Sequence, residues 1–214
     1  MLNPEHSKPS LPGPWRHRVS DLLLFGVTAV ELTILVLMTP TFTVTDWIYV
    51  SQHLIVLAIA ITRAPPQAQD RSLGTGIAVV VSYAYPYAQI IYLRLVPGDL
   101  AWPEGGFVLV TIAAFLSAAS LITLGRRFGV RPALRNLTDK GPYALVRHPM
   151  YLSYLLADIG YNLQEWNAGT ALMVVTGWAS LLYRVRAEER ILSLDAGWQT
   201  YAGRVRYRLL PGIW

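Results

Sequence analysis

Six long apolar segments follow one another along the chain, and they constrain its fold more than any other feature. They lie at 19–39, 47–62, 75–96, 107–124, 150–164 and 168–183. A helix needs about 20 mainly apolar residues to cross a hydrocarbon core about 30 Å thick. The second segment and the last two are short for this. The pattern predicts an all-α, polytopic integral membrane bundle of five or six transmembrane helices, and the 53% hydrophobic and 14% charged composition agrees with it.

The basic residues predict how such a bundle is oriented. With six crossings and a cytoplasmic N-terminus, every Lys and Arg of the chain except Arg94 falls on the cytoplasmic side. Basic residues near helix ends favour that side. Both termini are therefore expected in the cytoplasm. The net charge of +5 is explained by orientation and by attraction to anionic lipid, so nucleic acid is not expected as a partner.

Several classes of chemistry are excluded by the composition. The chain has no cysteine, which rules out disulfides, thiolate metal sites and cysteine catalysis, and no metal site is expected. Residues 1–18 form a polar segment without the short apolar core and cleavage site of a signal peptide. We therefore expect the first apolar segment to remain as a transmembrane helix.

Glu31, His53 and Asp158 are among the ionisable residues that fall within or near the apolar segments. An ionisable group inside a membrane is a candidate for function because leaving it unpaired there is costly. Glu31 and His53 either contact a substrate or form hydrogen bonds between helices. For Asp158, a structural polar contact is the favoured interpretation. A tyrosine cluster around Pro86 is typical of a kinked helix with an aromatic interface, and a substrate groove is the less favoured alternative. Its members are Tyr83, Tyr85, Tyr87 and Tyr92.

The stretch KGPYALVRHPMYLSYLLAD at 140–158 passes directly from charged residues into an apolar segment. Pro149 suits the first turn of a helix, where its missing N–H group is not needed. The free N–H groups of such a helix start attract anions, and Arg147 would strengthen that attraction. An anion site and an interfacial membrane anchor both remain open. The basic loop that precedes it, about 20 residues from Gly125, is long enough to suggest a function.

The adjacent acidic residues Glu188 and Glu189 cannot share one helix face. One of them can therefore point inward while the other meets solvent or an arginine. We expect the residues that follow 183 to form an amphipathic helix at the cytoplasmic surface. Under the predicted topology, the basic loop, the 147–151 cluster and the C-terminal tail all converge on one side of the membrane.

The segment GPYALVRHPMY resembles the G-P-Y-x-x-x-R-H-P-x-Y signature of the isoprenylcysteine carboxyl methyltransferase family and of the related phospholipid N-methyltransferases. LGRRFGV at 124–130 is similar to the family segment upstream of that signature, and RAEERIL at 186–192 to its acidic motif. The closing tail is also similar, through Tyr201, Arg204, Val205, Leu210, Pro211 and Gly212. The resemblance covers about residues 120–214 and suggests a bacterial-type member in the inner (cytoplasmic) membrane.

The resemblance implies an integral membrane methyltransferase that uses S-adenosylmethionine and releases S-adenosylhomocysteine. Its catalytic residues would be Arg147, His148 and Tyr151. The residues that bind the methyl donor, S-adenosylmethionine, would be Tyr143, Leu145, Val146, His148, Glu188, Glu189, Tyr201 and Arg204. The chain would then divide into a polar cytosolic segment at 1–18, transmembrane helices on the lipid-substrate side at 19–124, and a catalytic region with a cytosolic donor site at 125–214.

The acceptor implied is a lipid or a prenylated small molecule from the bilayer, with carboxyl O-methylation of an isoprenylcysteine-like group favoured. A carboxylate is already ionised at neutral pH, whereas an amine must lose a proton to a base such as His148 or Glu188. N-methylation of an aminophospholipid therefore remains an alternative. A non-enzymatic transporter or scaffold is another, as is a sterol-reductase-type enzyme, although the chain has no G-x-G-x-x-G dinucleotide fingerprint.

Overall fold

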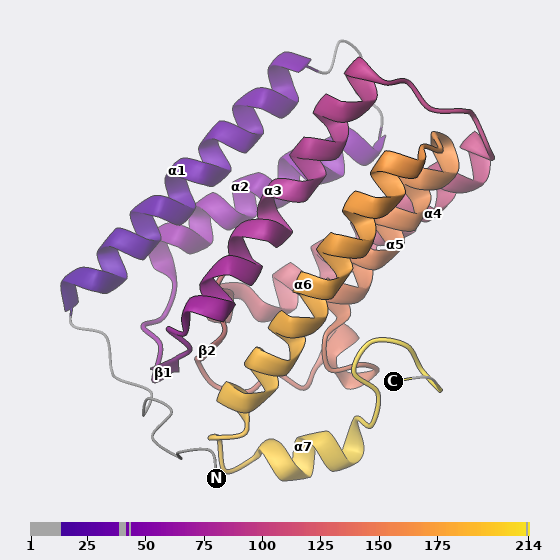
Figure 1. The fold of residues 1–214 in the computed structure, drawn as a ribbon. Coiled ribbons are helices and arrows are strands. Elements are labelled where there is room, and N and C mark those ends of the chain that lie inside the picture. The colour runs from indigo at the N-terminus through magenta and orange to yellow at the C-terminus, as the bar shows by residue number, and fades with distance from the viewer. Residues whose placement is uncertain (1–13, 39–41, 43, 213) are drawn as a thin grey trace, which may run out of the picture.

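Six long helices run alternately up and down through the molecule (Figure 1). The computed structural model describes residues 14–38, 42, 44–212 and 214, so the prediction for 1–18 lies largely outside the described residues. The helices are α1 (Pro14–Met38), α2 (Val44–Thr62), α3 (Leu73–Leu95), α4 (Pro103–Leu124), α5 (Pro149–Gln164), α6 (Ala168–Leu192) and the short α7 (Trp198–Arg204). Two 3₁₀ turns, η1 (Gly125–Arg127) and η2 (Gly141–Ala144), and two short strands, β1 (Ala68–Gln69) and β2 (Ala133–Leu134), complete the fold.

Each of the six long helices contains the described residues of one predicted apolar segment, apart from Val96 at the end of the third, which confirms the all-α membrane bundle. Among the described residues, three helical stretches are long and apolar enough to cross a membrane, at Leu73–Leu93, Pro103–Arg127 and Ala168–Leu192. Shorter apolar stretches lie at Leu24–Leu37 and Asp46–Thr62. The chain is therefore an integral membrane protein, and the count of five or six spans stays a prediction.

The C-terminal end of α6 differs from the sequence prediction. A separate amphipathic surface helix was expected after residue 183, but α6 continues without interruption to Leu192. No Gly or Pro interrupts the helix there, and one face of the extension is buried through Arg184, Val185, Ala187 and Ile191. The RAEER motif is thus a rigid continuation of the last apolar helix.

Glycines allow the helix pairs to approach closely. A Cβ atom on Gly160 of α5 would lie 2.7 Å from Val110 Cγ2 and 2.9 Å from the Gly106 carbonyl oxygen of α4. In a similar way, the Tyr85 ring of α3 occupies the space beside Gly177 of α6, where a Cβ atom would lie 2.6 Å from the ring. Close approach at small residues is a main source of helix association in membranes.

Several polar groups inside the bundle contact one another across helices. Asp158 Oδ2 accepts hydrogen bonds from the Tyr85 hydroxyl at 2.6 Å and from Trp178 Nε1 at 2.8 Å, which confirms the predicted structural contact. Glu31 of α1 and His53 of α2 lie 3.7 Å apart, between Oε2 and Nε2. This contact favours a helix–helix role for both residues.

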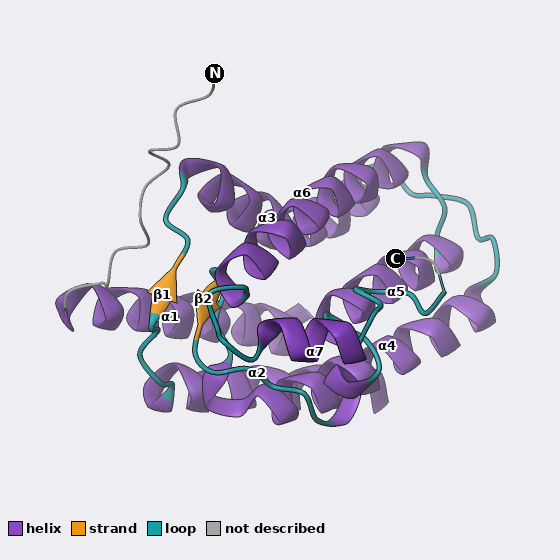
Figure 2. Cartoon of the chain, turned by 90° about the horizontal axis from the view of Figure 1, so that it is seen from below, coloured by secondary structure: helices purple, strands orange, loops and turns teal. Residues whose placement is uncertain are grey.

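One end of the bundle gathers most of the non-helical chain, and we call it the polar end. It comprises the loop at 63–72, the segment at 125–148 and the C-terminal segment at 193–212 (Figure 2). Strands β1 and β2 pair antiparallel there, with Ala68 opposite Leu134, and the Ala64 N–H donates to the Arg126 carbonyl. The predicted convergence of the basic loop, the 147–151 cluster and the tail is confirmed.

The close contact between α4 and α5 gives a test of the packing. Replacing Gly160 with Leu should destabilise the fold by about 1–3 kcal/mol, because the side chain would overlap the α4 backbone. Thermal unfolding in detergent, followed by tryptophan fluorescence, measures the effect. Gly26→Leu is the control, because a Cβ atom on Gly26 meets nothing within 4 Å. Equal midpoints for both variants would contradict the packing described.

Candidate active site

The segment before α5 has a defined local geometry. Gly141 adopts a positive φ of 54°, which favours glycine, and begins the turn η2. His148 is the N-cap residue of α5 and Pro149 occupies the first turn, as the sequence predicts. The Arg147 N–H donates to the Tyr207 carbonyl and the His148 N–H to the Arg208 carbonyl, both at 2.9 Å. The C-terminal tail therefore pairs with the chain just before the helix.

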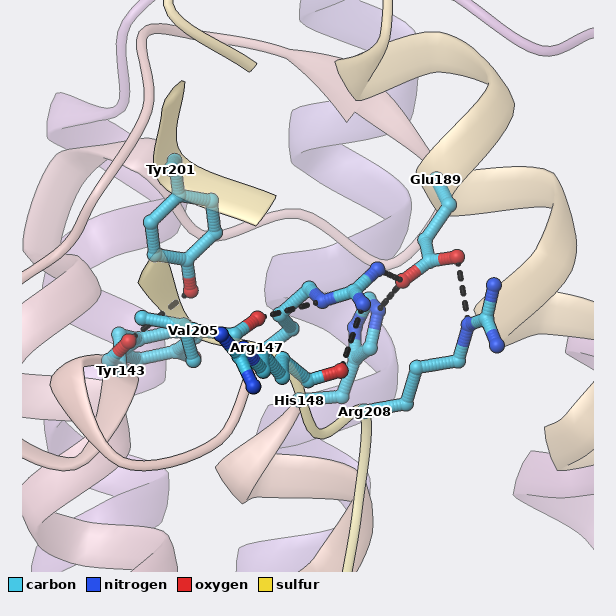
Figure 3. A network of polar contacts seen from close by, with 8 residues as sticks. Tyr143, Arg147, His148, Glu189, Tyr201, Val205 and Arg208 are labelled. Carbon is cyan, nitrogen blue, oxygen red and sulfur yellow. Dashed lines mark hydrogen bonds and ion pairs between the residues drawn. The ribbon is translucent and has the colours of Figure 1, made fainter. Parts of the chain in front are cut away.

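Glu189 is the centre of an ionic cluster at the polar end (Figure 3). Its Oε1 lies 2.6 Å from Arg147 Nη1, and its Oε2 lies 2.7 Å from Arg208 Nε. His148 Nε2 lies 3.5 Å from Oε1 but forms no hydrogen bond with it. Only 13% of the Glu189 side chain is exposed. We call Arg147, Glu189 and Arg208 the clamp, since these residues join three separate parts of the chain.

Arg147 directs its guanidinium donors to partners within the protein. Its Nε donates to the Val205 carbonyl at 2.9 Å, and its Nη2 to the Arg206 carbonyl at 2.8 Å, in addition to the bond with Glu189. Its guanidinium also lies 5.8 Å from the centre of the Trp198 ring. Arg147 therefore holds the tail in place; the catalytic role predicted for it stays a prediction.

The tail is fixed further by contacts around α7. The Tyr201 hydroxyl donates to the Tyr143 carbonyl at 3.0 Å, and Arg204 forms an exposed ion pair with Asp139. Trp198, Tyr201 and Val205 are buried together. α7 therefore covers the turn η2 from outside.

A cavity of about 50 Å³ lies inside the polar end, next to the clamp. Four arginines line it, namely Arg127, Arg131, Arg135 and Arg184, and of its described lining residues only Glu188 is a carboxylate. The aromatic part of the lining consists of Tyr83, Phe128, Tyr143, Tyr151 and Tyr154. His148 completes the polar part. A lining with this charge balance attracts an anionic group.

Unpaired nitrogen atoms gather at this cavity. Across the described part of the chain, three buried side-chain nitrogens have no hydrogen-bond partner: Arg131 Nε, His148 Nε2 and Arg184 Nε. All three residues line the same cavity. Buried polar groups without a partner are rare and costly, so their concentration here indicates a ligand site.

The two adjacent glutamates divide as the sequence predicts. Glu189 faces the clamp, whereas Glu188 lines the cavity. Burial raises the pKa of the Tyr143 phenol, another lining group, well above its usual value. The Tyr143 phenol is therefore neutral at physiological pH and does not serve as a base there.

The predicted site residues fall into two groups. Tyr143, His148, Tyr151 and Glu188 line the cavity. Arg147, Glu189, Tyr201 and Arg204 are not among its described lining residues, and they belong to the clamp and to the contacts of the tail. Val146 is buried but does not line the cavity either. Leu145 is 72% exposed. The individual roles assigned to all of these residues remain predictions.

The structure adds residues that the sequence did not connect with this site. Arg184 is 4% exposed, donates to Ser82 Oγ at 2.7 Å, and lies 5.2 Å from the centre of the Tyr151 ring. Its position four residues before Glu188 places both on one face of α6, which was a usable signal. Tyr83 comes from α3, and no local pattern connected it with this site.

The fold and the site define an integral membrane protein with a cationic, tyrosine-lined ligand cavity at one end of its helices. Residues 106–194, which contain most of α4, all of α5 and α6 and most of the cavity lining, match the Isoprenylcysteine carboxyl methyltransferase (ICMT) family. The chain is also 26% identical over 161 residues to Protein-S-isoprenylcysteine O-methyltransferase B of Arabidopsis thaliana, covering 70% of this chain and 82% of that protein. The matched segment covers fewer than half of the residues of the chain, and both similarities point to the family that the 141–151 and 186–192 segments resemble.

The division between Glu188 and Glu189 gives a matched pair of variants. Glu189→Gln should loosen the tail, because Arg147 and Arg208 lose a charged acceptor at a cost of about 1–3 kcal/mol. Limited trypsin digestion after Arg206 or Arg208, analysed by mass spectrometry, measures this. Glu188→Gln has the same size and charge change but should leave the tail as resistant as wild type. Equal digestion of the two variants would contradict the separate roles.

Proposed function

We propose that this protein is an S-adenosylmethionine-dependent methyltransferase that methylates the carboxylate of an isoprenylcysteine-like acceptor taken from the bilayer. The observation that carries the proposal is a cavity lined by Glu188 and by the three residues whose buried nitrogens have no hydrogen-bond partner, within the segment matched to the family. The name of the Arabidopsis relative supports the same acceptor class.

The residues of the cavity fit the donor's chemical groups. The Glu188 carboxylate could accept hydrogen bonds from ribose hydroxyls, as acidic residues do in nucleotide-binding folds. Arg184 Nε and His148 Nε2 could donate to a carboxylate, while tyrosine faces favour a sulfonium cation. Glu188 and His148 are therefore proposed as donor-binding residues, with Tyr143 and Tyr151 forming aromatic walls.

The charge of the lining favours a carboxylate acceptor over an amine. Four arginines against one glutamate would repel the ammonium form of an aminophospholipid and attract a carboxylate. A carboxylate also needs no proton removed, which agrees with a Tyr143 phenol that burial keeps neutral. O-methylation is thus favoured over the alternative of N-methylation.

The protein's part in such a reaction is positioning and exclusion of water. When bound, S-adenosylmethionine supplies a methyl group on a sulfonium. The arginines of the lining would orient the acceptor carboxylate toward it, and the tyrosines would keep water away from the reacting atoms. The clamp would act indirectly, since Arg147 and Glu189 hold the tail that packs over Tyr143.

The cavity must enlarge to admit the donor. Its volume of about 50 Å³ is far below the ~300–1,000 Å³ typical of small-molecule pockets. The segment at 125–135 supplies much of the lining. It is tied to the 62–72 segment by the β1–β2 pair and by hydrogen bonds from the side chains of Arg126, Arg131 and Arg135 to backbone carbonyls there. We propose that this segment moves outward when the donor enters.

The proposal includes the membrane orientation predicted from the sequence. The polar end would face the cytosol of a bacterial inner membrane, with both termini on that side, because the donor is a polar cytosolic molecule. The division into segments 1–18, 19–124 and 125–214 belongs to the proposal, with one addition: α3 of the middle segment contributes Tyr83 to the cavity.

Labelling membranes with methyl-tritiated S-adenosylmethionine tests the reaction. A prenylcysteine acceptor should gain a label that mild base releases as methanol, because the product is an ester. Glu188→Gln should lower the affinity for S-adenosylhomocysteine about 10-fold or more, through loss of a charged hydrogen-bond acceptor. Arg186→Gln, an exposed change on the same helix, is the control. A base-stable label on a phospholipid amine would instead establish N-methylation, and no labelled lipid would overturn the proposal.

The pH dependence distinguishes the two acceptor classes independently. A carboxylate with a pKa of about 3.5 is fully ionised from about pH 6 to 9, so methyl transfer should not rise with pH across that range. Burial keeps the Tyr143 phenol protonated throughout, because its raised pKa lies above the range. Initial rates at saturating donor measure this. A rate that rises steadily toward pH 9 would instead indicate an amine that must be deprotonated.

A further inference from the structure

A second hollow lies on the outer side of α3, and it is apolar. Its volume is about 500 Å³, and Leu73, Gly76, Ile77, Val79, Val80, Val81 and Arg131 line it. Leu73, Ile77 and Val80 are each more than half exposed. Only 12% of the apolar stretch of α3 is buried inside the protein, so this side of the helix faces hydrocarbon in a membrane. We call this hollow the α3 groove.

Arg131 lines both the α3 groove and the cationic cavity. Its guanidinium crosses α3 at Gly76, where an added Cβ atom would lie 2.9 Å from Nη2. The Nη2 group donates one long hydrogen bond of 3.3 Å to the Ser72 carbonyl, while the buried Nε has no partner. A cation therefore stands where an apolar surface open to lipid meets the polar interior.

We propose that Arg131 binds the carboxylate of the acceptor at this junction while the acceptor's isoprenoid chain lies in the α3 groove. This inference rests on the proposed function, since it assumes a prenylated carboxylate as acceptor. The groove volume lies within the range of small-molecule pockets, and its lining carries one charged group, of the sign that a carboxylate needs. A guanidinium is also well suited to bidentate carboxylate binding.

Other arginines near the cavity are held more firmly. Arg147 donates to Glu189 and to two carbonyls. Arg184 is 4% exposed, and its two Nη groups donate to Ser82 Oγ and the Val130 carbonyl. Arg131 is half-buried and lies at the edge of the groove, so it can reach an acceptor that enters from the bilayer.

Acceptor binding without the donor tests the carboxylate contact. The probe is tritiated N-acetyl-S-farnesylcysteine, compared with its methyl ester, on protein purified in detergent. Arg131→Gln should weaken binding of the acid about 10-fold or more and leave the ester unchanged, because only the acid carries the charge. Gly76→Val should give the same selective loss by displacing the guanidinium. Unchanged binding of the acid, or equal losses for acid and ester, would overturn the inference.

A bulky substitution tests the groove. Val80→Trp should fill the groove and weaken binding of both the acid and the ester several-fold, since both carry the isoprenoid chain. Ile91→Trp is the matched control, because Ile91 is similarly exposed on the same helix (62% against 65%) but does not line the groove. Identical effects of the two variants would mean that the groove holds only ordinary bilayer lipid, and the inference would fail.

The outcomes separate this inference from the proposed function. If the wild-type protein methylates the farnesylcysteine probe and Arg131→Gln binds the acid normally, the proposed function stands but Arg131 does not bind the acceptor carboxylate. Selective acid binding that depends on Arg131, without any methyl transfer, would support the junction and overturn the function. Failure of the wild-type protein to bind either form of the probe would overturn both.

Discussion

The ionic clamp at Glu189 is the interaction on which the rest of the polar end depends. One carboxylate joins Arg147 before α5 to Arg208 in the tail, and Arg147 binds two further tail carbonyls. A partly buried carboxylate with two charged donors is stable only if both remain in place. The clamp therefore fixes the end of α6 relative to the start of α5, and with it the wall of the cavity.

This arrangement explains why two glutamates stand side by side on α6. Glu189 is engaged by the clamp, so its neighbour Glu188, on another face of the helix, is left to face the cavity. Because α6 continues rigidly from its apolar part, a carboxylate is held at a fixed height relative to the bilayer. The methyl donor and the prenylated acceptor that we propose would then meet at the boundary between water and hydrocarbon.

Much of this architecture could be predicted from the sequence. The apolar segments located all six long helices, and Pro149 located the start of α5. Because Glu188 and Glu189 are neighbours in the sequence, they were expected to face different surroundings. The continuation of α6 was missed because its charged residues suggested a surface helix, although one face is buried. Tyr83 and Arg131 could not be assigned, since they join the cavity through contacts with segments far away in the sequence.

We propose that the methyl donor binds in the cavity beside Glu188. Arg147 and Glu189 would act indirectly, by holding the tail that packs over Tyr143. An experimental structure of the complex with S-adenosylhomocysteine tests this claim most directly. The account predicts ligand density between Glu188, His148 and the tyrosines of the lining, with the Arg147–Glu189 pair intact. Density that instead engages Glu189 and displaces Arg147, or that lies elsewhere in the bundle, would contradict it.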